Sequence, residues 1–323
     1  MNFALLDQLS LPGDPAKPNE DALAHLDHAA LVLDGATPLG PSLLPGPSDA
    51  AWIAQFGARR LAAHLKDGDA PRHALKRALA DTEKSFAGLS REPIREKWQA
   101  PCASMMLVAL GRDLPPLRAQ SALAGEVVVA GPGGPSAKRS SGPFAGPTAS
   151  EDRRGTEIQF LWFGDCAAIV EQDNHVEMIG ETLEKRQAEA QRAKSVARTA
   201  KMSSAAGINR PEIEPLLRAA RNRINSGRNW LFSPDVRAAG HVMHRTMMLN
   251  EGAMMLIASD GFLALATDYD AYDMQGLMAA AKSKGLAALG EQLRAIEKTD
   301  PLGEKFSRFK KSDDATALLL CVR

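Results

Sequence analysis

Cysteines and aromatic residues are both scarce in this sequence. The three cysteines, Cys102, Cys166 and Cys321, are far apart and form no CxxC pair, which excludes a disulfide framework and favours a reducing compartment. Phe, Trp and Tyr together make up 5% of the 323 residues, which is few for a protein that stacks bases on aromatic platforms. We therefore expect neither a disulfide-stabilised secreted domain nor an aromatic nucleic-acid reader.

Net charge and long apolar runs are missing as well. Thirty-nine Lys and Arg residues balance 39 Asp and Glu residues, whereas nucleic-acid-binding surfaces usually give a basic excess. The most apolar stretch, residues 254–266, is interrupted by Asp260 and is too short to span a membrane. The first 15 residues lack the basic and apolar regions of a signal peptide. These absences predict a soluble cytoplasmic protein that binds neither nucleic acid nor membrane, and they leave its oligomeric state open.

What is present is a mixture of apolar strands and amphipathic helices. The hydrophobic spacing predicts strands at 22–33 (one strand, or a hairpin of two), 102–110, 253–259 and 315–322, and a hairpin around Gly164-Asp165 within 157–172. It predicts helices from a cap at Asp49 to about 66, at 72–86, 181–204 and 211–224, and one or two within 273–298. This order favours an α+β layered fold, a single domain over 1–323. A Pro-, Gly- and Ser-rich insertion at about 112–155 and a helical insertion at about 181–225 interrupt it.

Acidic residues recur where apolar strands meet turns. They are Glu20 and Asp21 before the first strand, Asp34 in LVLDG, Asp260 in LIASDG, and Asp313 and Asp314 before ATALLL. Asp-Gly is also a common turn dipeptide, and any one of these sites alone is more often a turn than a ligand. Carboxylates that converge from several strand ends repel one another unless a cation holds them. Oxygen ligands without a neighbouring His or Cys favour Mg²⁺ or Mn²⁺ over zinc.

Six elements follow one another in an order that resembles a known family. They are Asn19-Glu20-Asp21, LVLDG, PCASMM at 101–106, FGDCAA at 163–168, MLIASDG at 255–261 and SDDATALLLCV at 312–322. The family is the metal-dependent protein phosphatases (PPM, the type 2C serine/threonine phosphatases). The resemblance implies a four-layer α-β-β-α sandwich, with two mostly antiparallel central sheets flanked by helices. It also implies hydrolysis of phosphoserine or phosphothreonine in a protein substrate by a water activated at a binuclear Mg²⁺ or Mn²⁺ centre.

The resemblance assigns metal-binding roles to seven positions, namely Glu20, Asp21, Asp34, Gly35, Asp165, Asp260 and Asp313. Asp34 would bridge two metal ions, with the carbonyl of Gly35 as a further ligand. Asp260 and Asp313 would bind the first metal and, with Asp34, count as the catalytic residues. Glu20 would bind the second metal, Asp21 would hold a coordinated water, and Asp165 matches the ligand of a third ion that some members carry.

The sequence departs from the family pattern at positions outside this metal set. Ala16 stands where members usually carry a phosphate-binding Arg, and Lys17, one residue away, is the candidate substitute. DGATP lacks the His that follows the glycine in many members, GDCAA lacks an Arg, and the threonine-aspartate-histidine element has no clear match. Two alternatives therefore stay open. One is a non-catalytic phosphatase-like protein that binds phosphoproteins or regulates a partner, and the other is a phosphatase of small phosphorylated metabolites.

Several histidines could suggest other chemistry. His241 and His244 have the i, i+3 spacing of a helix but no Glu arranged for zinc, so we expect no metal site there. His25 and His28 lie near the acidic residues in sequence, and we expect structural roles for both.

Overall fold

The computed structural model describes residues 1–111, 155–180, 210–301, 303–306, 308 and 310–323. Within these ranges the strands form two five-stranded sheets in which every neighbouring pair is antiparallel. The first sheet has the order β1 (Phe3–Leu11), β10 (Ala315–Val322), β9 (Met254–Ala258), β6 (Ala167–Gln172) and β7 (His175–Gly180). The second has the order β2 (Asp21–Leu26), β3 (Ala29–Gly35), β4 (Ala103–Leu110), β5 (Thr156–Phe163) and β8 (Met243–Leu249).

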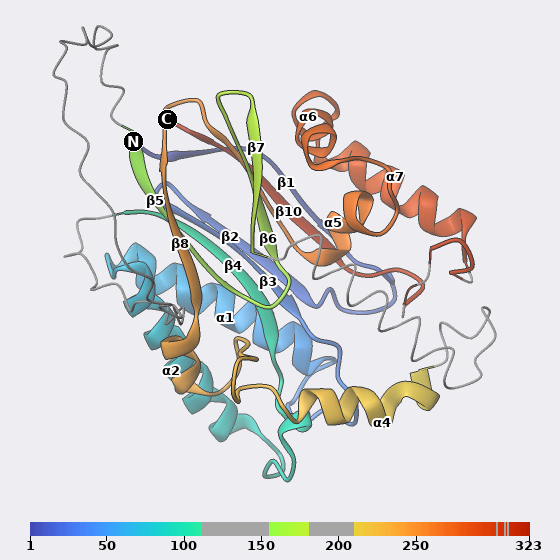
Figure 1. Cartoon of the computed structure of the whole chain (residues 1–323). Helices are drawn as coiled ribbons and strands as arrows, with labels where there is room; N and C mark the ends of the chain where they lie inside the picture. The colour runs from blue at the N-terminus through green and yellow to red at the C-terminus, as the bar shows by residue number, and fades with distance from the viewer. Residues whose placement is uncertain (112–154, 181–209, 302, 307, 309) are drawn as a thin grey trace, which may run out of the picture.

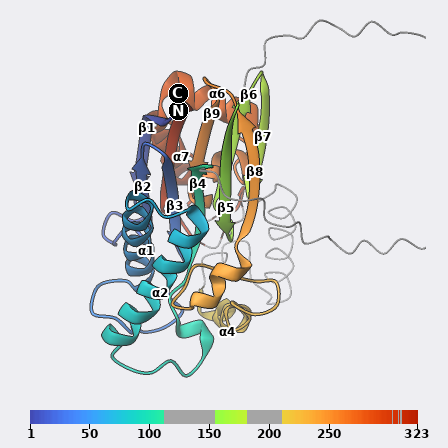
Figure 2. The ribbon, with the colours of Figure 1, turned by 90° about the vertical axis from the view of Figure 1, so that its left-hand side faces the viewer.

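Helices cover the outer face of each sheet (Figures 1 and 2). The helices α1 (Asp49–Lys66) and α2 (Pro71–Leu89) lie on the second sheet, while α5 (Asp260–Thr267), α6 (Met274–Lys284) and α7 (Leu286–Thr299) lie on the first. The helix α4 (Arg210–Arg221) lies at the lower end of the second sheet in Figure 1, and two 3₁₀ helices span Lys97–Gln99 and Val236–His241. The predicted α+β class and the four-layer α-β-β-α arrangement are both confirmed.

The main hydrophobic core has three layers, one between the sheets and one between each sheet and its outer helices. Strand β3 shows how alternation fills two of them: Leu31 and Leu33 pack under α1 and α2, while Ala30 and Val32 pack against the other sheet. Strand β4, whose two faces are both covered, is apolar from Met105 to Leu110, as its burial requires.

The predicted hairpin around Gly164-Asp165 is wrong. Strand β5 pairs with β4 and β8, whereas β6 pairs with β7 and β9 in the other sheet. The chain therefore crosses between the sheets at residues 164–166. Both flanking strands have covered faces, so their apolar pattern does not distinguish a hairpin from a crossing. The true hairpin is β6–β7, whose turn places Asp173 and Asn174 at positive φ.

The N-cap of helix α1 is Ser48, one residue before the predicted cap Asp49. Ser48 caps the helix by accepting from the Ala51 N–H at 3.2 Å, and Asp49 lies in the first turn. The buried Asp49 carboxylate accepts instead from the backbone N–H groups of Leu43 and Leu44. Asp49 thus holds the preceding loop against the helix.

The helical spacing read into His241 and His244 is also wrong. His241 ends the 3₁₀ helix Val236–His241 and stacks on Trp230, with ring centroids 3.7 Å apart. His244 lies in strand β8, which the sequence pattern did not identify because most of its residues are exposed. His25 and His28 lie within hydrogen-bond distance of backbone carbonyls, 3.1 Å in each case.

The remaining predicted elements lie close to their observed bounds. The segment 22–33 is the β2–β3 hairpin, the segment 273–298 is the helix pair α6 and α7, and the helix predicted at 211–224 is α4. Strand β1 was not predicted. The helix predicted at 181–204 and nearly all of the insertion predicted at 112–155 lie outside the described residues. Among the helices that are described, none is long and apolar enough to cross a membrane.

Candidate metal centre

The apolar layer between the two sheets becomes polar at one end of the sandwich. Along each strand every second side chain faces the layer between the sheets. At this end of the sandwich the inward-facing side chains are polar: Asp21, Asp34, Ser104, Ser259 and Thr316. Asp21 and Asp34 are direct partners across β2 and β3, and Asp34 in turn faces Ser104 across β3 and β4. Two carboxylates opposite one another on a sheet repel, so an ordinary core would not place them there.

Asp21 is the more deeply buried of the two carboxyl groups in this set, with 4% of its surface exposed. The Ser259 hydroxyl donates to its Oδ2 at 2.8 Å, and the same hydroxyl oxygen accepts the backbone N–H of Thr316 at 3.0 Å. The Asp21 Oδ1 is buried and has no hydrogen-bond partner among the described residues. Burial raises the pKa of Asp21 to about 8, and the charges of Asp313 and Asp314 add to that shift.

Four other aspartates act on the pKa of Asp34, and together with it they form what we call the cluster: Asp21, Asp34, Asp165, Asp260 and Asp313. Burial is the largest cause that raises the pKa of Asp34 well above the usual range, and the four other aspartates raise it further. The influence of one charge on the pKa of another group falls off with distance. These five carboxyl groups therefore occupy one region. The structure therefore brings together aspartates that the sequence separates by almost 300 positions.

Close backbone approach fixes Asp260 beside Asp313. A Cβ atom on Gly261 would lie 2.0 Å from the backbone oxygen of Asp314 and 3.3 Å from the Asp313 Cβ. Only glycine fits between these two segments. Gly261 thus allows the start of α5 to lie directly against the loop before β10.

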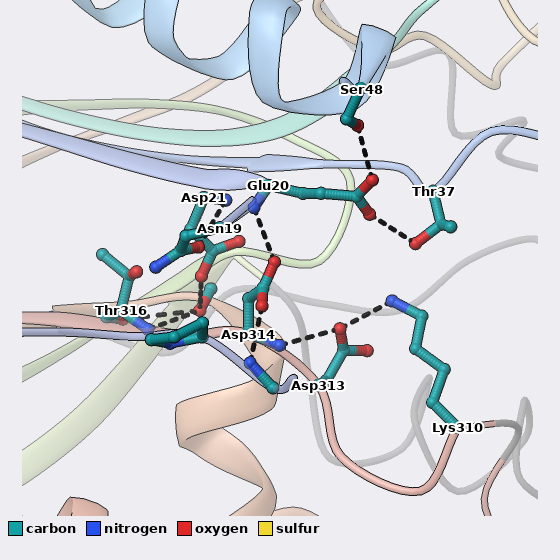
Figure 3. Close-up of polar contacts among 12 residues, drawn as sticks. Asn19, Glu20, Asp21, Thr37, Ser48, Lys310, Asp313, Asp314 and Thr316 are labelled. Atoms are coloured by element: carbon teal, nitrogen blue, oxygen red, sulfur yellow. Dashed lines mark hydrogen bonds and ion pairs between the residues drawn. The ribbon is translucent and has the colours of Figure 1, made fainter. Parts of the chain in front are cut away.

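Asp313 already has a cation beside it. The Lys310 Nζ lies 2.6 Å from Asp313 Oδ1, as Figure 3 shows. Burial and the charge of Asp260 raise the pKa of Asp313, and the Lys310 ammonium opposes both effects. Sequence reasoning missed Lys310, which belongs to a short run of basic residues that looks like an ordinary solvated loop.

Glu20 points toward the first turn of α1 and the loop before it (Figure 3). The hydroxyl groups of Thr37 and Ser48 each donate to one of its carboxylate oxygens, both at 2.6 Å. The Gly35 N–H donates to the Glu20 carbonyl at 2.9 Å, and a Cβ on Gly35 would lie 2.3 Å from the Ala50 oxygen. Glu20 and Gly35 thus lie together at the N-terminus of α1.

Asp314 has a structural role, which the sequence pattern did not distinguish from the metal-binding role expected of Asp313. Its two carboxylate oxygens accept the backbone N–H groups of Gly13 at 2.7 Å and of Glu20 at 2.6 Å. This carboxylate ties the β1–β2 connection to the start of β10. It thereby sets the position of the Glu20-Asp21 pair against the Asp313-Asp314 pair.

Asp165 lies where the chain crosses between the sheets. The preceding Gly164 has a φ of +66°, and a Cβ there would lie 2.2 Å from the Ser104 Oγ. The charges of Asp34 and Asp165 act on the neighbouring Cys166, whose thiol pKa is raised chiefly by burial. Cys166 packs in the layer between the sheets, so its thiol fills space beside the cluster.

Two cations, Lys17 and Arg221, differ in how they are placed relative to Glu20. Lys17, the predicted candidate, is 76% exposed at its side chain and pairs with Asp14 at 3.8 Å. Arg221 of α4, which the sequence did not suggest, donates to the Thr37 carbonyl at 2.9 Å. Arg221 is therefore linked to Glu20 through a single residue, Thr37, and it approaches from a helix remote in sequence.

The donor chemistry of the cluster fits a hard divalent cation. All its side-chain donors are carboxylate oxygens, one of them the buried and unpartnered Asp21 Oδ1. As the side chains stand, no three His, Cys, Asp or Glu residues of the described ranges form a group that could hold a metal ion. The fit of the cluster to a divalent cation therefore rests on two properties. Its donors are carboxylate oxygens, and their charges act on one another.

Comparisons with known proteins support the fold. No model of a protein family and no curated protein sequence matches this chain. Among solved structures, the chain is similar to the serine/threonine phosphatase PstP/Ppp of Mycobacterium tuberculosis, at 13% identity and a TM-score of 0.51 over 100% of both chains. It is also similar to a bacterial serine phosphatase, at 11% identity and a TM-score of 0.50 over 99% of this chain and 98% of that one. At this identity the likeness establishes a shared phosphatase fold.

Proposed function

We propose that this protein is a metal-dependent phosphatase that hydrolyses phosphoserine or phosphothreonine in proteins. The observation that carries the proposal is the convergence of Asp34, Asp21, Asp260, Asp165 and Asp313 on one region at the end of the sandwich. Burying like charges together is costly and gives the fold no benefit of its own. The phosphatase fold of the two solved structures adds the reaction class to that argument.

In this proposal Asp34, Asp260 and Asp313 would hold one Mg²⁺ or Mn²⁺, and Asp34 would also contribute to a second. Glu20, the Gly35 carbonyl and, through water, Asp21 would hold that second ion, and Asp165 would hold a third. Divalent ions held there would activate a water molecule and neutralise charge on the phosphoryl oxygens.

The protein's own residues would position this machinery. The Ser259 hydroxyl orients the Asp21 carboxyl group, and Asp314 fixes the Glu20 backbone through its N–H. Thr37 and Ser48 hold the Glu20 carboxylate in one orientation. Lys17 stays a candidate for phosphate binding, although its exposure and its pairing with Asp14 do not place it among these groups.

The test is hydrolysis by the purified protein of a chromogenic phosphate ester and of a phosphothreonine peptide. We expect turnover with Mn²⁺, loss of turnover with EDTA, and a loss of at least about 100-fold in Asp34→Asn and Asp260→Asn. Asp173→Asn, an equal change on an exposed turn residue with φ of 51°, is the matched control and should match the wild type. Activity that survives both EDTA and the two cluster variants would refute the mechanism.

One observation favours a second candidate, a non-catalytic protein that binds phosphoproteins. Two carboxylates assigned to metal binding already have protein partners, namely Glu20 with two hydroxyl groups and Asp313 with Lys310. Calorimetry with a phosphothreonine peptide separates the two candidates, because binding without turnover in the presence of Mn²⁺ would favour the second. A panel of small phosphorylated metabolites in the same assay tests the remaining alternative.

A further inference from the structure

Lys310 is the cation that the structure places in the acidic cluster. Its ammonium group lies 2.6 Å from Asp313 Oδ1, and both side chains are a little more than one-third exposed. Burial works against the charge of Lys310, but the negative charges of Asp313, Asp34 and Asp260 outweigh it and raise the lysine pKa. The ammonium therefore remains charged at neutral pH and interacts with three of the aspartates to which metal binding is assigned above.

The loop that carries Lys310 is anchored on both sides. On one side the Asp300 carboxylate accepts the backbone N–H groups of Glu304, Lys305 and Phe306, and pairs with Arg308 at 2.9 Å. On the other side the Arg294 guanidinium donates to the Asp313 carbonyl at 2.7 Å. Figure 3 shows the Lys310 side chain directed toward Asp313.

One carboxylate oxygen of the cluster, Asp21 Oδ1, has no hydrogen-bond partner among the described residues, which favours a cation as its ligand. The Asp21 Oδ1 is buried, and no described residue hydrogen-bonds to it, while Lys310 neutralises charge only at the Asp313 side. Within the described residues, the ammonium of Lys310 is within ion-pair distance of only one of the five carboxyl groups, so the other four do not share this contact. A divalent ion that bound Asp313 would lie close to the Lys310 ammonium, which contacts Oδ1 of that carboxylate, and the two positive charges would repel.

We propose that Lys310 is an internal counter-cation that competes with the divalent metal for Asp313 and so lowers the metal affinity of the centre. The inference rests on the proposed function, because it takes the aspartate cluster as the metal site. Metal binding would exchange the Lys310–Asp313 ion pair for a metal–carboxylate bond and release the lysine side chain from the cluster. In the metal-free protein the same ion pair would reduce repulsion among the aspartates.

The test measures Mn²⁺ binding directly, by titration calorimetry on protein freed of metal with a chelator, at fixed ionic strength. Lys310→Met removes the competing charge, and we expect its Mn²⁺ dissociation constant to fall about fivefold, the equivalent of a partly exposed ion pair. Lys311→Met removes the same charge from the next, exposed residue and should stay within about twofold of the wild type. Lys310→Arg retains the charge and should also stay near the wild type.

The possible outcomes distinguish a failure of the Lys310 inference from a failure of the proposed function. If Lys310→Met binds Mn²⁺ no more tightly than Lys311→Met while the wild type hydrolyses phosphopeptide, the inference falls and the proposed function stands. If neither the wild type nor Lys310→Met binds Mn²⁺, both fall. Circular dichroism confirms that each variant is folded, and Lys310→Gln provides a second uncharged variant should Lys310→Met not fold.

Discussion

Ser259→Ala is the substitution that tests most directly how the cluster is held together. Ser259 is fully buried, and its hydroxyl connects the two sheets by donating to Asp21 Oδ2 of β2 at 2.8 Å and accepting the Thr316 N–H of β10 at 3.0 Å. Alanine would leave both of these groups without that partner. Each buried polar group left unsatisfied costs about 1–3 kcal/mol. We expect the free energy of unfolding to fall by about 3 kcal/mol.

Equilibrium unfolding in urea at pH 7, with EDTA present, measures this loss. Ser283→Ala is the matched control, because the Ser283 hydroxyl is exposed and donates to the Ala279 carbonyl within α6. That control should change the unfolding free energy by less than about 0.5 kcal/mol. A double-mutant cycle with Asp21→Asn then isolates the pair, and we expect a coupling energy of at least about 1 kcal/mol. A loss below about 1 kcal/mol, or additive effects in the cycle, would refute this account of the Asp21–Ser259 contact.

Two further predictions concern the segments around the cluster. Backbone N–H groups and Arg308 outweigh burial and lower the pKa of Asp300 to about 2, so its stabilising effect is complete above about pH 4 and is lost as the pH falls through 2. Asp300→Asn should therefore lower the unfolding free energy by about 2 kcal/mol at pH 7 and by about half of that at pH 3, and urea titrations at both pH values check this. Gly261→Ala should cost about 3 kcal/mol, because its Cβ would lie 2.0 Å from the Asp314 oxygen. Gly88→Ala in α2, where a Cβ meets nothing within 4 Å, should instead stabilise by up to about 1 kcal/mol.

The sequence pattern indicated candidate site residues, but it did not indicate the full path of the chain. Asp34, Asp260 and Asp313 could be found because each adjoins an apolar strand, and their order along the chain adds information that no single Asp-Gly carries. The crossing at Gly164-Asp165 could not be found in this way. A strand covered on both faces has no alternating pattern, so nothing local indicates which sheet it joins.

Residues that act through tertiary contacts were also beyond the sequence. Lys310 and Arg221 belong to segments that look like solvated basic surface, and only the fold brings them to Asp313 and Thr37. Ser259 precedes Asp260 in the sequence, yet its partner is Asp21, 238 residues away. Such long-range polar contacts have no periodicity, so a pattern of hydrophobic spacing cannot reveal them.

The position of the cluster explains how one fold carries both a stable core and a costly site. Along β3 the inward side chains are Ala30 and Val32 within the layer between the sheets, and the next inward residue is Asp34 at its end. The apolar layer therefore stays continuous, and the repulsion is confined to the end of the sandwich, where glycines allow the backbones to approach. Lys310 can offset part of that repulsion from a loop without entering the core. In the proposed mechanism, a cation that arrived from solvent would meet the aspartates at this same end, and it would displace the lysine while the two sheets stayed packed.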